Sequence, residues 1–461
     1  MCIFPPLILF ILIRSLNTVK HFGYKMLLFG AFNGTKGCAV LRKIYNWNPS
    51  FPFYYGWAIL AASFFSTFAA TSVAQVVLGG VQVFILEETG WKETEFSITI
   101  AIGTWLSGFI SPFVGKFADK YGPRQMMPIA LVIVAICYFI IGGIPAFVSF
   151  GIAYIVARTI TQPILINVVP RTVTVNFFRK RRNIALSLVT MSRPVAGAFN
   201  IHLISYITKH YGWRNAYHVL GAFSLFLTIP LFFIMRKTPE EIGLEPDGSS
   251  ENPKEIASGQ TGDTEYSWMF QSAIRTKAFW LLAIVTSLVT LSSSSVQFTL
   301  VPYYVETLNL SKIQAASIFS LGTVLALSNL LWALLADKYS PRKILICNLT
   351  IAALLLIALM NIEAAWQAWV FAIFWGVFSG AAGTLEQMVL AQYFGRGSYG
   401  TITGAIGPMQ ITALGCGPAV GAIIHTFTGS YHLLYILITI TYVSCACFTV
   451  LARQPERPTN V

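Results

Sequence analysis

The chain carries one short stretch twice: GKFADKYGPRQ from Gly115 to Gln125, and WALLADKYSPRK from Trp332 to Lys343. The aspartates of the two copies, Asp119 and Asp337, lie about 217 residues apart. Each copy joins two long apolar segments through a tight, charged turn. A duplicated turn of this kind in a mainly apolar chain predicts a membrane protein built from two related halves.

The composition indicates that the lipid bilayer is the solvent. Of 461 residues, 55% are hydrophobic and only 11% are charged, with a mean hydropathy of +0.66. A soluble domain carries about 25% charged residues. In lipid the backbone must satisfy its own hydrogen bonds, and long continuous apolar runs do this as helices. We therefore expect an all-α membrane protein.

Twelve apolar runs are long enough to cross a bilayer. Six fall in each half, so two pseudo-symmetric six-helix bundles are expected, inserted with the same topology and related by an axis along the membrane normal. The expected spans are Trp57–Leu86, Phe96–Phe117, Met126–Ile144, Phe147–Val169, Asn183–Ile207, Ala216–Met235, Ala278–Tyr304, Ile313–Ala336, Ile344–Met360, Trp366–Ala391, Tyr399–Thr426 and Tyr431–Leu451.

The Lys and Arg residues behind the net charge of +13 are distributed by side of the membrane, so we attribute this charge to membrane topology and expect no nucleic-acid partner. Loops after even-numbered spans, together with the C-terminal tail, hold 19 Lys and Arg residues, Arg171 among them. The opposite side holds four: Lys92, Lys209, Arg214 and Lys312. Because positive loops stay inside, both termini and the central loop are expected in the cytoplasm, with the protein in a plasma (bacterial inner) membrane.

The polar segments suggest domain boundaries. The bundles are expected at residues 51–236 and 278–453, joined by a cytoplasmic linker at 237–277 and followed by a tail at 454–461. The linker is rich in Ser, Gly, Pro and acids, which is typical of a flexible connection. Residues 1–50 are expected to form an irregular extension; a signal peptide, a half-inserted helix or a start at Met26 are the alternatives.

The pattern of Gly115, Asp119, Gly122 and Arg124 resembles the signature loop of the major facilitator superfamily. Other strings resemble its oxalate/formate antiporter and monocarboxylate transporter branch: FYYGWAIL (53–60), TPEEIGLEPDG (238–248), AFWLL (278–282) and YFGRGSYGTITG (393–404). The resemblance implies a secondary transporter. Spans one, eight and eleven lack the Lys and Arg that carboxylate-binding members often carry, so no substrate is carried over.

The two loop aspartates are predicted to control a gate. A carboxylate at the end of a span can cap a helix of the other half and pair with a nearby arginine, in one conformation only. The alternative is a plain topogenic turn in which Gly122 and Pro123 make the bend. The predicted gating set comprises Asp119, Arg124, Gly115, Gly122, Asp337 and Arg342.

Two arginines in the first half are candidates for binding substrate. Arg158 and Arg193 lie about 17 Å and about 15 Å into their spans, near the centre of a hydrocarbon core about 30 Å thick. Each costs about 2.5–3.5 kcal/mol there. Because no acid lies within spans one to six, an anionic ligand is the expected counter-ion. The alternative is an arginine satisfied by helix carbonyls, Gln162 or Asn200.

The repeat extends this site into the second half. The residue equivalent to Arg193 is Gln410, which is expected either to donate to the same ligand or to bond within its own bundle. The residue equivalent to Arg158 is Trp375, expected either to wall the cavity or to pack in the core.

Glu386 is the one acid within the expected spans seven to twelve. A carboxylate in a membrane span can bind the proton that couples transport. The alternative, which the position of Glu386 near the cytoplasmic end of its span favours, is a gate ion pair with Lys338 or Arg342.

Together these features predict a secondary transporter that moves a small mono- or dicarboxylate by alternating access, driven by protons or anion exchange. No nucleotide-binding loop and no metal-ligand spacing is present, so no enzyme activity, cofactor or metal is expected. Two rivals stay open: a carrier of neutral or cationic solutes with structural arginines, and a non-transporting receptor or scaffold. The expected partners are the substrate and the lipid bilayer, and the protein is expected to act as a monomer.

Overall fold

A computed structural model describes residues 51–73, 82, 85–248, 267–325 and 328–456. The expected N-terminal extension (1–50), much of the linker (249–266) and the last five residues lie outside these ranges. Eleven helices in the described part of the chain are long and apolar enough to cross a bilayer, or twelve with α14 and α15 counted as one bent span. The predicted all-α, twelve-helix membrane fold is confirmed.

The first half contains six spans. They are α3 (Tyr55–Ala70), α5 (Glu93–Tyr121), α6 (Pro123–Gly143), α7 (Phe147–Ile160) continued by η3 (Thr161–Asn167) and α8 (Val168–Phe177), α9 (Arg182–Tyr211) and α10 (Trp213–Ile234). The described part of the first span ends with the short η2 (Thr71–Val73), and its predicted remainder lies largely outside the described residues.

The second half repeats this arrangement. Its helices are α13 (Lys277–Leu308), α14 (Lys312–Leu325) with α15 (Asn329–Tyr339), α16 (Pro341–Leu359), α17 (Ala365–Ser379) with α18 (Ala382–Phe394), α19 (Tyr399–Thr428) and α20 (His432–Leu451).

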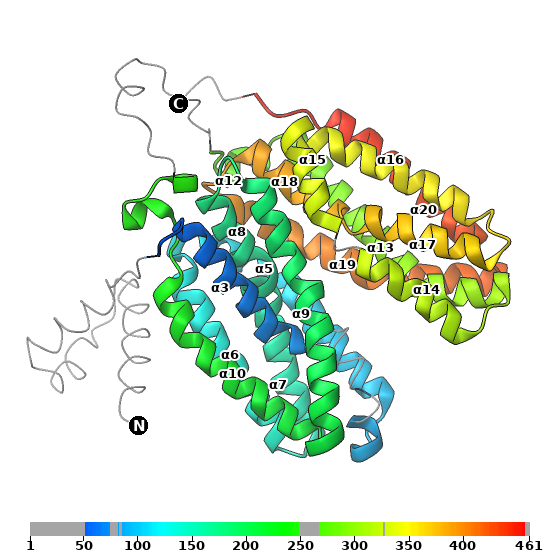
Figure 1. The fold of residues 1–461 in the computed structure, drawn as a ribbon, viewed down its shortest axis with the longest axis horizontal. Coiled ribbons are helices and arrows are strands. Elements are labelled where there is room, and N and C mark those ends of the chain that lie inside the picture. Colours follow the sequence, from blue (N-terminus) through cyan, green and yellow to red (C-terminus); the bar gives the residue numbers. More distant parts are fainter. Residues whose placement is uncertain (1–50, 74–81, 83–84, 249–266, 326–327, 457–461) are drawn as a thin grey trace, which may run out of the picture.

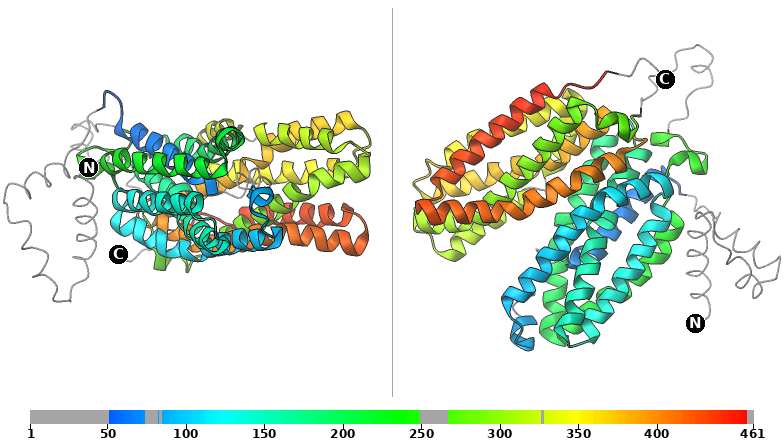
Figure 2. Two further views of the ribbon diagram at one scale, coloured as in Figure 1. Left: turned by 90° about the horizontal axis from the view of Figure 1, so that it is seen from below. Right: turned by 180° about the vertical axis from the view of Figure 1, so that it is seen from behind.

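Each half has its own hydrophobic core. One core gathers buried residues between Tyr55 and Met235, and the other gathers residues between Trp268 and Ala452 together with Val175 and Leu186 of the first half. Figures 1 and 2 show the halves meeting at one end and diverging toward the other. We call the meeting end, where Asp119 and Asp337 lie, the motif end.

The repeated turn has the same backbone shape in both halves. Gly122 (φ 76°) and Ser340 (φ 83°) each separate two helices, and each is followed by a proline at the first position of the next helix. Pro is favoured there because it lacks an N–H, and an N–H at this position would have no partner within the helix. A positive φ favours glycine, so Ser340 occupies a strained position that Gly122 fills without cost.

The fourth span is longer than predicted. We expected it to end at Val169, but the helix continues to Phe177 through the π-helical η3. Pro163 within η3 lacks an N–H, and the Val168 N–H bonds to the Pro163 carbonyl five residues back, as a π-helix requires. Arg171 therefore lies in a helix and not in a loop, which corrects its inclusion among the loop cations.

Parts of the linker are ordered around short turns. Two 3-10 turns, η4 (Pro239–Ile242) and η5 (Pro246–Gly248), follow the first half. The short helix α12 (Phe270–Ala273) precedes the second half. The Asp247 carboxylate accepts the backbone N–H groups of Arg179, Lys180 and Arg181, so the linker docks on the loop before α9.

Candidate functional site

Asp119 caps the first turn of α19, a helix of the other half. Its Oδ1 accepts the Gly400 N–H at 3.0 Å, and its Oδ2 accepts the Thr401 N–H and hydroxyl at 2.6 Å each. These N–H groups have no partner inside the helix and lie at the positive end of its dipole. The carboxylate therefore ties α5 to α19 through charge-assisted hydrogen bonds. The nearby positive charge comes from Lys237 rather than from the expected arginine.

Asp337 makes the matching contact in the second half. Its Oδ1 accepts a hydrogen bond from the side-chain amide of Asn183 at 2.7 Å, and Asn183 lies in the first turn of α9. Asp337 is exposed and accepts this one hydrogen bond from a side chain. Asp119 accepts three hydrogen bonds, two of them from backbone N–H groups. The two halves are thus tied by the same kind of contact, made more extensively by Asp119.

Glycines allow α5 and α19 to touch along their backbones. A Cβ on Gly115 would lie 2.0 Å from the Gly400 carbonyl oxygen, and one on Gly404 would lie 2.5 Å from the Ser111 carbonyl oxygen. Only residues without a side chain permit this approach. The crossing holds the halves together at the motif end, next to the Asp119 contact.

Arg124 and Arg342 contact their own halves. The Arg124 Nε donates to the Phe232 carbonyl at 3.2 Å, near the end of α10. The Arg342 Nε donates to the Thr449 carbonyl at 3.2 Å and its Nη2 to that of Val450, near the end of α20. A guanidinium is favourable at a helix C-terminus. These contacts pack each arginine against the end of a helix in its own half, and the gating role of Arg124 and Arg342 stays a prediction.

Other side chains also cross the motif end. The Arg396 Nη2 lies 2.7 Å from the Glu240 carboxylate of the linker, and its Nη1 donates to the Asn176 carbonyl at 3.4 Å. The Arg182 Nη1 donates to the Ala391 carbonyl at 3.2 Å. Burial opposes ionisation of Glu240, but hydrogen bonds and the charge of Arg396 outweigh it and lower its pKa.

Arg193 lies open near the centre of the molecule. It is about 16 Å from the start of α9 at 1.5 Å per residue, and its side chain is exposed although protein surrounds it. Its charge is repelled by Arg158 and Arg171. No described residue forms a hydrogen bond or ion pair with it. The Asn200 Oδ1, one alternative acceptor, has no hydrogen-bond partner among the described residues.

Arg158 is enclosed within the first half. It is 1% exposed; its Nη1 donates to Gln162 Oε1 at 3.1 Å and its Nε to Thr104 Oγ1 at 3.4 Å. Its aliphatic stem packs where a Cβ of Gly103 would lie. The structural alternative, satisfaction by Gln162, describes Arg158, and we no longer count it as a direct substrate contact.

A small polar cavity lies between the halves. It has a volume of about 40 Å³ and is lined by residues of α5, η3, α8, α18 and α19, including Gln410, Arg171, Gln162 and Gln387. Gln410 is thus at the interface of the halves, as the repeat predicted. Arg171 was missed because the fourth span was ended too early; the run of Thr, Val and Phe after it indicates that the helix continues.

Glu386 is deeply buried beside this cavity. It is 2% exposed, and its Oε1 has no hydrogen-bond partner in the described structure. Its charge and that of Arg171, a residue of the other half, attract each other. The Arg342 guanidinium is engaged with α20 instead, and the Lys338 Nζ lies over the Tyr339 ring, 5.2 Å from its centroid. No ion pair joins Glu386 to either residue in the described part of the chain, so the gate pair stays a prediction.

Trp375 packs in the core of the second half. It is 8% exposed, stacks on Phe371 with ring centroids 5.7 Å apart and meets Tyr442 edge-on at 6.3 Å. Of the two roles expected from the repeat, these contacts fit core packing and not the wall of the cavity.

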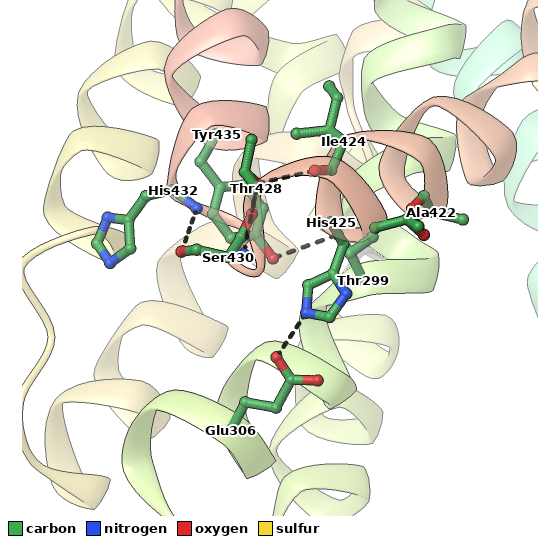
Figure 3. Close-up of polar contacts among 10 residues, drawn as sticks. Thr299, Glu306, Ala422, Ile424, His425, Thr428, Ser430, His432 and Tyr435 are labelled. Atoms are coloured by element: carbon green, nitrogen blue, oxygen red, sulfur yellow. Dashed lines mark hydrogen bonds and ion pairs between the residues drawn. The ribbon is translucent and has the colours of Figure 1, made fainter.

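A contact between a histidine and a glutamate lies in the second half, at the end away from the motif end. The His425 Nε2 lies 3.0 Å from the Glu306 Oε2, joining α19 to α13 (Figure 3). The His425 ring also stacks on Tyr431 at 4.3 Å. Because α13 extends to Leu308, Glu306 lies inside a span, so Glu386 is not the only acid in the helices of this half.

The sequence matches a family of membrane transporters. A family model described as Major Facilitator Superfamily matches residues 59–410 and 282–461. The chain is similar in fold to the transporter FucP in its outward conformation, with a TM-score of 0.67 at 14% identity, covering 86% of this chain and 98% of that one.

Two curated relatives match parts of the chain. Human monocarboxylate transporter 14 is 27% identical over 49% of this chain, and the membrane sensor protein UhpC of Salmonella typhimurium is 23% identical over 58%. The matched regions span 45% and 60% of the length of these two proteins.

Proposed function

Because the chain belongs to the major facilitator superfamily, we propose that it is a secondary transporter that moves a small organic anion across the membrane. The halves rock about a site near the midplane and expose it to each side in turn. The observation that supports an anionic substrate is Arg193, whose exposed guanidinium lies at mid-span with no acceptor among the described residues.

The charges around the site favour a negatively charged substrate. Three arginines, Arg158, Arg171 and Arg193, repel one another in a region where the described helices contribute one carboxylate, Glu386. Placing unpaired cations away from water is costly. A carboxylate that binds Arg193 in a bidentate manner relieves this repulsion, and Gln410 on the opposite half donates to its far end.

The contacts at the motif end support a conformation closed on that side. Asp119 on α19 and Asp337 on Asn183 both link the halves there, while the bundles diverge at the other end (Figure 1). We place the motif end, the linker and both termini in the cytoplasm, following the distribution of Lys and Arg. The closed gate must release these contacts before substrate reaches the cytoplasm.

Transport is coupled to a proton or to a second anion. Glu386 is our candidate for the proton-binding group, because it is buried, has an unpartnered oxygen and faces Arg171. A substrate anion and Glu386 compete for the same positive region, which links binding of the anion to the charge of this carboxylate.

A thermal-stability screen of the purified protein tests whether its ligand is a carboxylate bound by Arg193. A ligand that binds only the folded state raises the melting temperature with its concentration. We expect mono- and dicarboxylates larger than formate to raise it in the native protein and not in Arg193→Gln. Arg158→Gln is not a suitable control, because Arg158 holds the first half together. Equal shifts in the native and variant proteins would contradict the assignment of Arg193.

A receptor without transport is the second candidate, favoured by the similarity to the sensor UhpC. Both candidates bind a solute at the same site, so binding does not separate them. Flux of a bound solute in proteoliposomes does: a transporter equilibrates it across the membrane, whereas a receptor leaves the lumen empty.

A further inference from the structure

We infer that the small polar cavity between the halves is a binding site for one compact anion, of the size of chloride or formate, centred on Arg171. This site is distinct from Arg193, which does not line the cavity. It lies between the gate and the midplane: Thr403 and Gln410 of its wall are about 6 Å and about 16 Å from the start of α19.

The cavity wall presents hydrogen-bond donors. The Arg171 side chain lines it, and its buried Nε has no hydrogen-bond partner. The Gln162 Oε1 is occupied by Arg158, and the Gln387 Oε1 accepts the hydroxyl of Tyr399 at 3.0 Å. With their oxygens engaged, these two buried side chains have their NH₂ groups left as donors for a ligand in the cavity. A guanidinium and two amide donors around one cavity favour an anion over water or a cation.

The size of the cavity limits the ligand. About 40 Å³ holds about three water molecules. Chloride or formate fits this space. One binding chemistry therefore has two sources: a free inorganic anion, or the carboxylate group of a very small substrate.

The cavity lies between the two halves, so an anion bound in it affects how the halves hold together. Its wall comes from α5, η3 and α8 of the first half and from α18 and α19 of the second. An anion bound here shields Arg171 and bridges donors of both halves, Gln162 and Gln387. It therefore stabilises the state in which the motif end is closed, and it leaves when the halves separate.

Anion-dependent melting of the purified protein tests this site. The melting temperature is measured in sodium gluconate and again with chloride, or with formate, at the same ionic strength. We expect chloride and formate each to raise it by several degrees in the native protein. A rise with formate alone assigns the site to a substrate carboxylate, and a rise with both assigns it to any compact anion. No rise with either overturns the inference.

Variants separate this site from the transported-anion site. Arg171→Gln is expected to abolish the rise with chloride and formate, and Arg171→Lys, which keeps the charge, to retain part of it should the glutamine variant fold poorly. Arg193→Gln is expected to keep the chloride rise while losing the response to larger carboxylates. An undiminished chloride rise in Arg171→Gln, or in both Arg171 variants, contradicts the assignment.

Discussion

At the residue scale, the three central arginines differ in what neutralises them. Arg158 is held by Thr104 and Gln162, Arg171 faces Glu386, and Arg193 has no described acceptor. The sequence predicted two of these cations, because charges inside apolar runs are visible, and offered Gln162 as one alternative acceptor. It did not reveal which arginine is enclosed, since that depends on neighbours from other helices.

The two copies of the turn give a prediction for one residue. Ser340 has a φ of 83°, which costs a residue with a side chain about 1–3 kcal/mol. Ser340→Gly is therefore expected to raise the free energy of unfolding by about 1 kcal/mol, measured by denaturant titration in detergent. The matched change, Gly122→Ser, is expected to lower it, because its Cβ would also lie 2.7 Å from Lys237. A lower stability for Ser340→Gly would contradict this account.

At the element scale, contact between α5 and α19 depends on residues without side chains. The motif containing Gly115 was predicted to form a gate, and a crossing of this closeness requires glycine on both helices. The partner glycines of α19 were not singled out, because closeness between two helices is a property of their packing. The same limit hid Arg171, whose helix continues through the π-helical segment beyond the expected end of its span.

Enlarging Gly115 tests this crossing. Gly115→Val places a side chain where the Gly400 carbonyl lies and is expected to force α5 and α19 apart, which opens the motif end and lowers the melting temperature by several degrees. Gly197→Ala is the matched control: a Cβ there meets no atom within 4 Å, and alanine favours a helix by about 1 kcal/mol. The account fails here if both variants melt alike.

At the scale of the whole molecule, closure of the motif end depends unequally on the two repeats. Asp119 accepts three hydrogen bonds from α19, whereas Asp337 accepts one from Asn183. Sequence repetition predicted that both aspartates act, and it could not show this asymmetry. The linker adds a further tie through Glu240 and Arg396, where flexible chain was expected.

Hydrogen exchange measures this asymmetry. Hydrogen bonds to a charged group contribute about 1.5–3 kcal/mol. Asp119→Asn is therefore expected to speed exchange of the Gly400 and Thr401 amides at least about tenfold, while Asp337→Asn leaves them within about twofold. Similar protection in both variants would show that the carboxylate does not hold the gate.

The Glu240 contact responds to acid. The pKa of Glu240 is lowered in the folded protein, so its contribution is complete above the ordinary glutamate pKa and is lost as pH falls through the lowered value. As an exposed pair it contributes up to about 1 kcal/mol. In the native protein, acid is therefore expected to speed hydrogen exchange of the backbone amides near residues 395–398, and Glu240→Gln is expected to remove this increase. If the increase persists in the variant, another group is responsible for it.

Solute flux through proteoliposomes tests the central claim most directly. Vesicles loaded with an unlabelled carboxylate are placed in the labelled compound, and the native protein is compared with Arg193→Gln at matched insertion. We predict saturable uptake of a small carboxylate by the native protein and a loss of at least about tenfold in the variant. Equal carboxylate uptake by both proteins, or uptake of neutral or cationic solutes alone, would contradict an anion carried on Arg193.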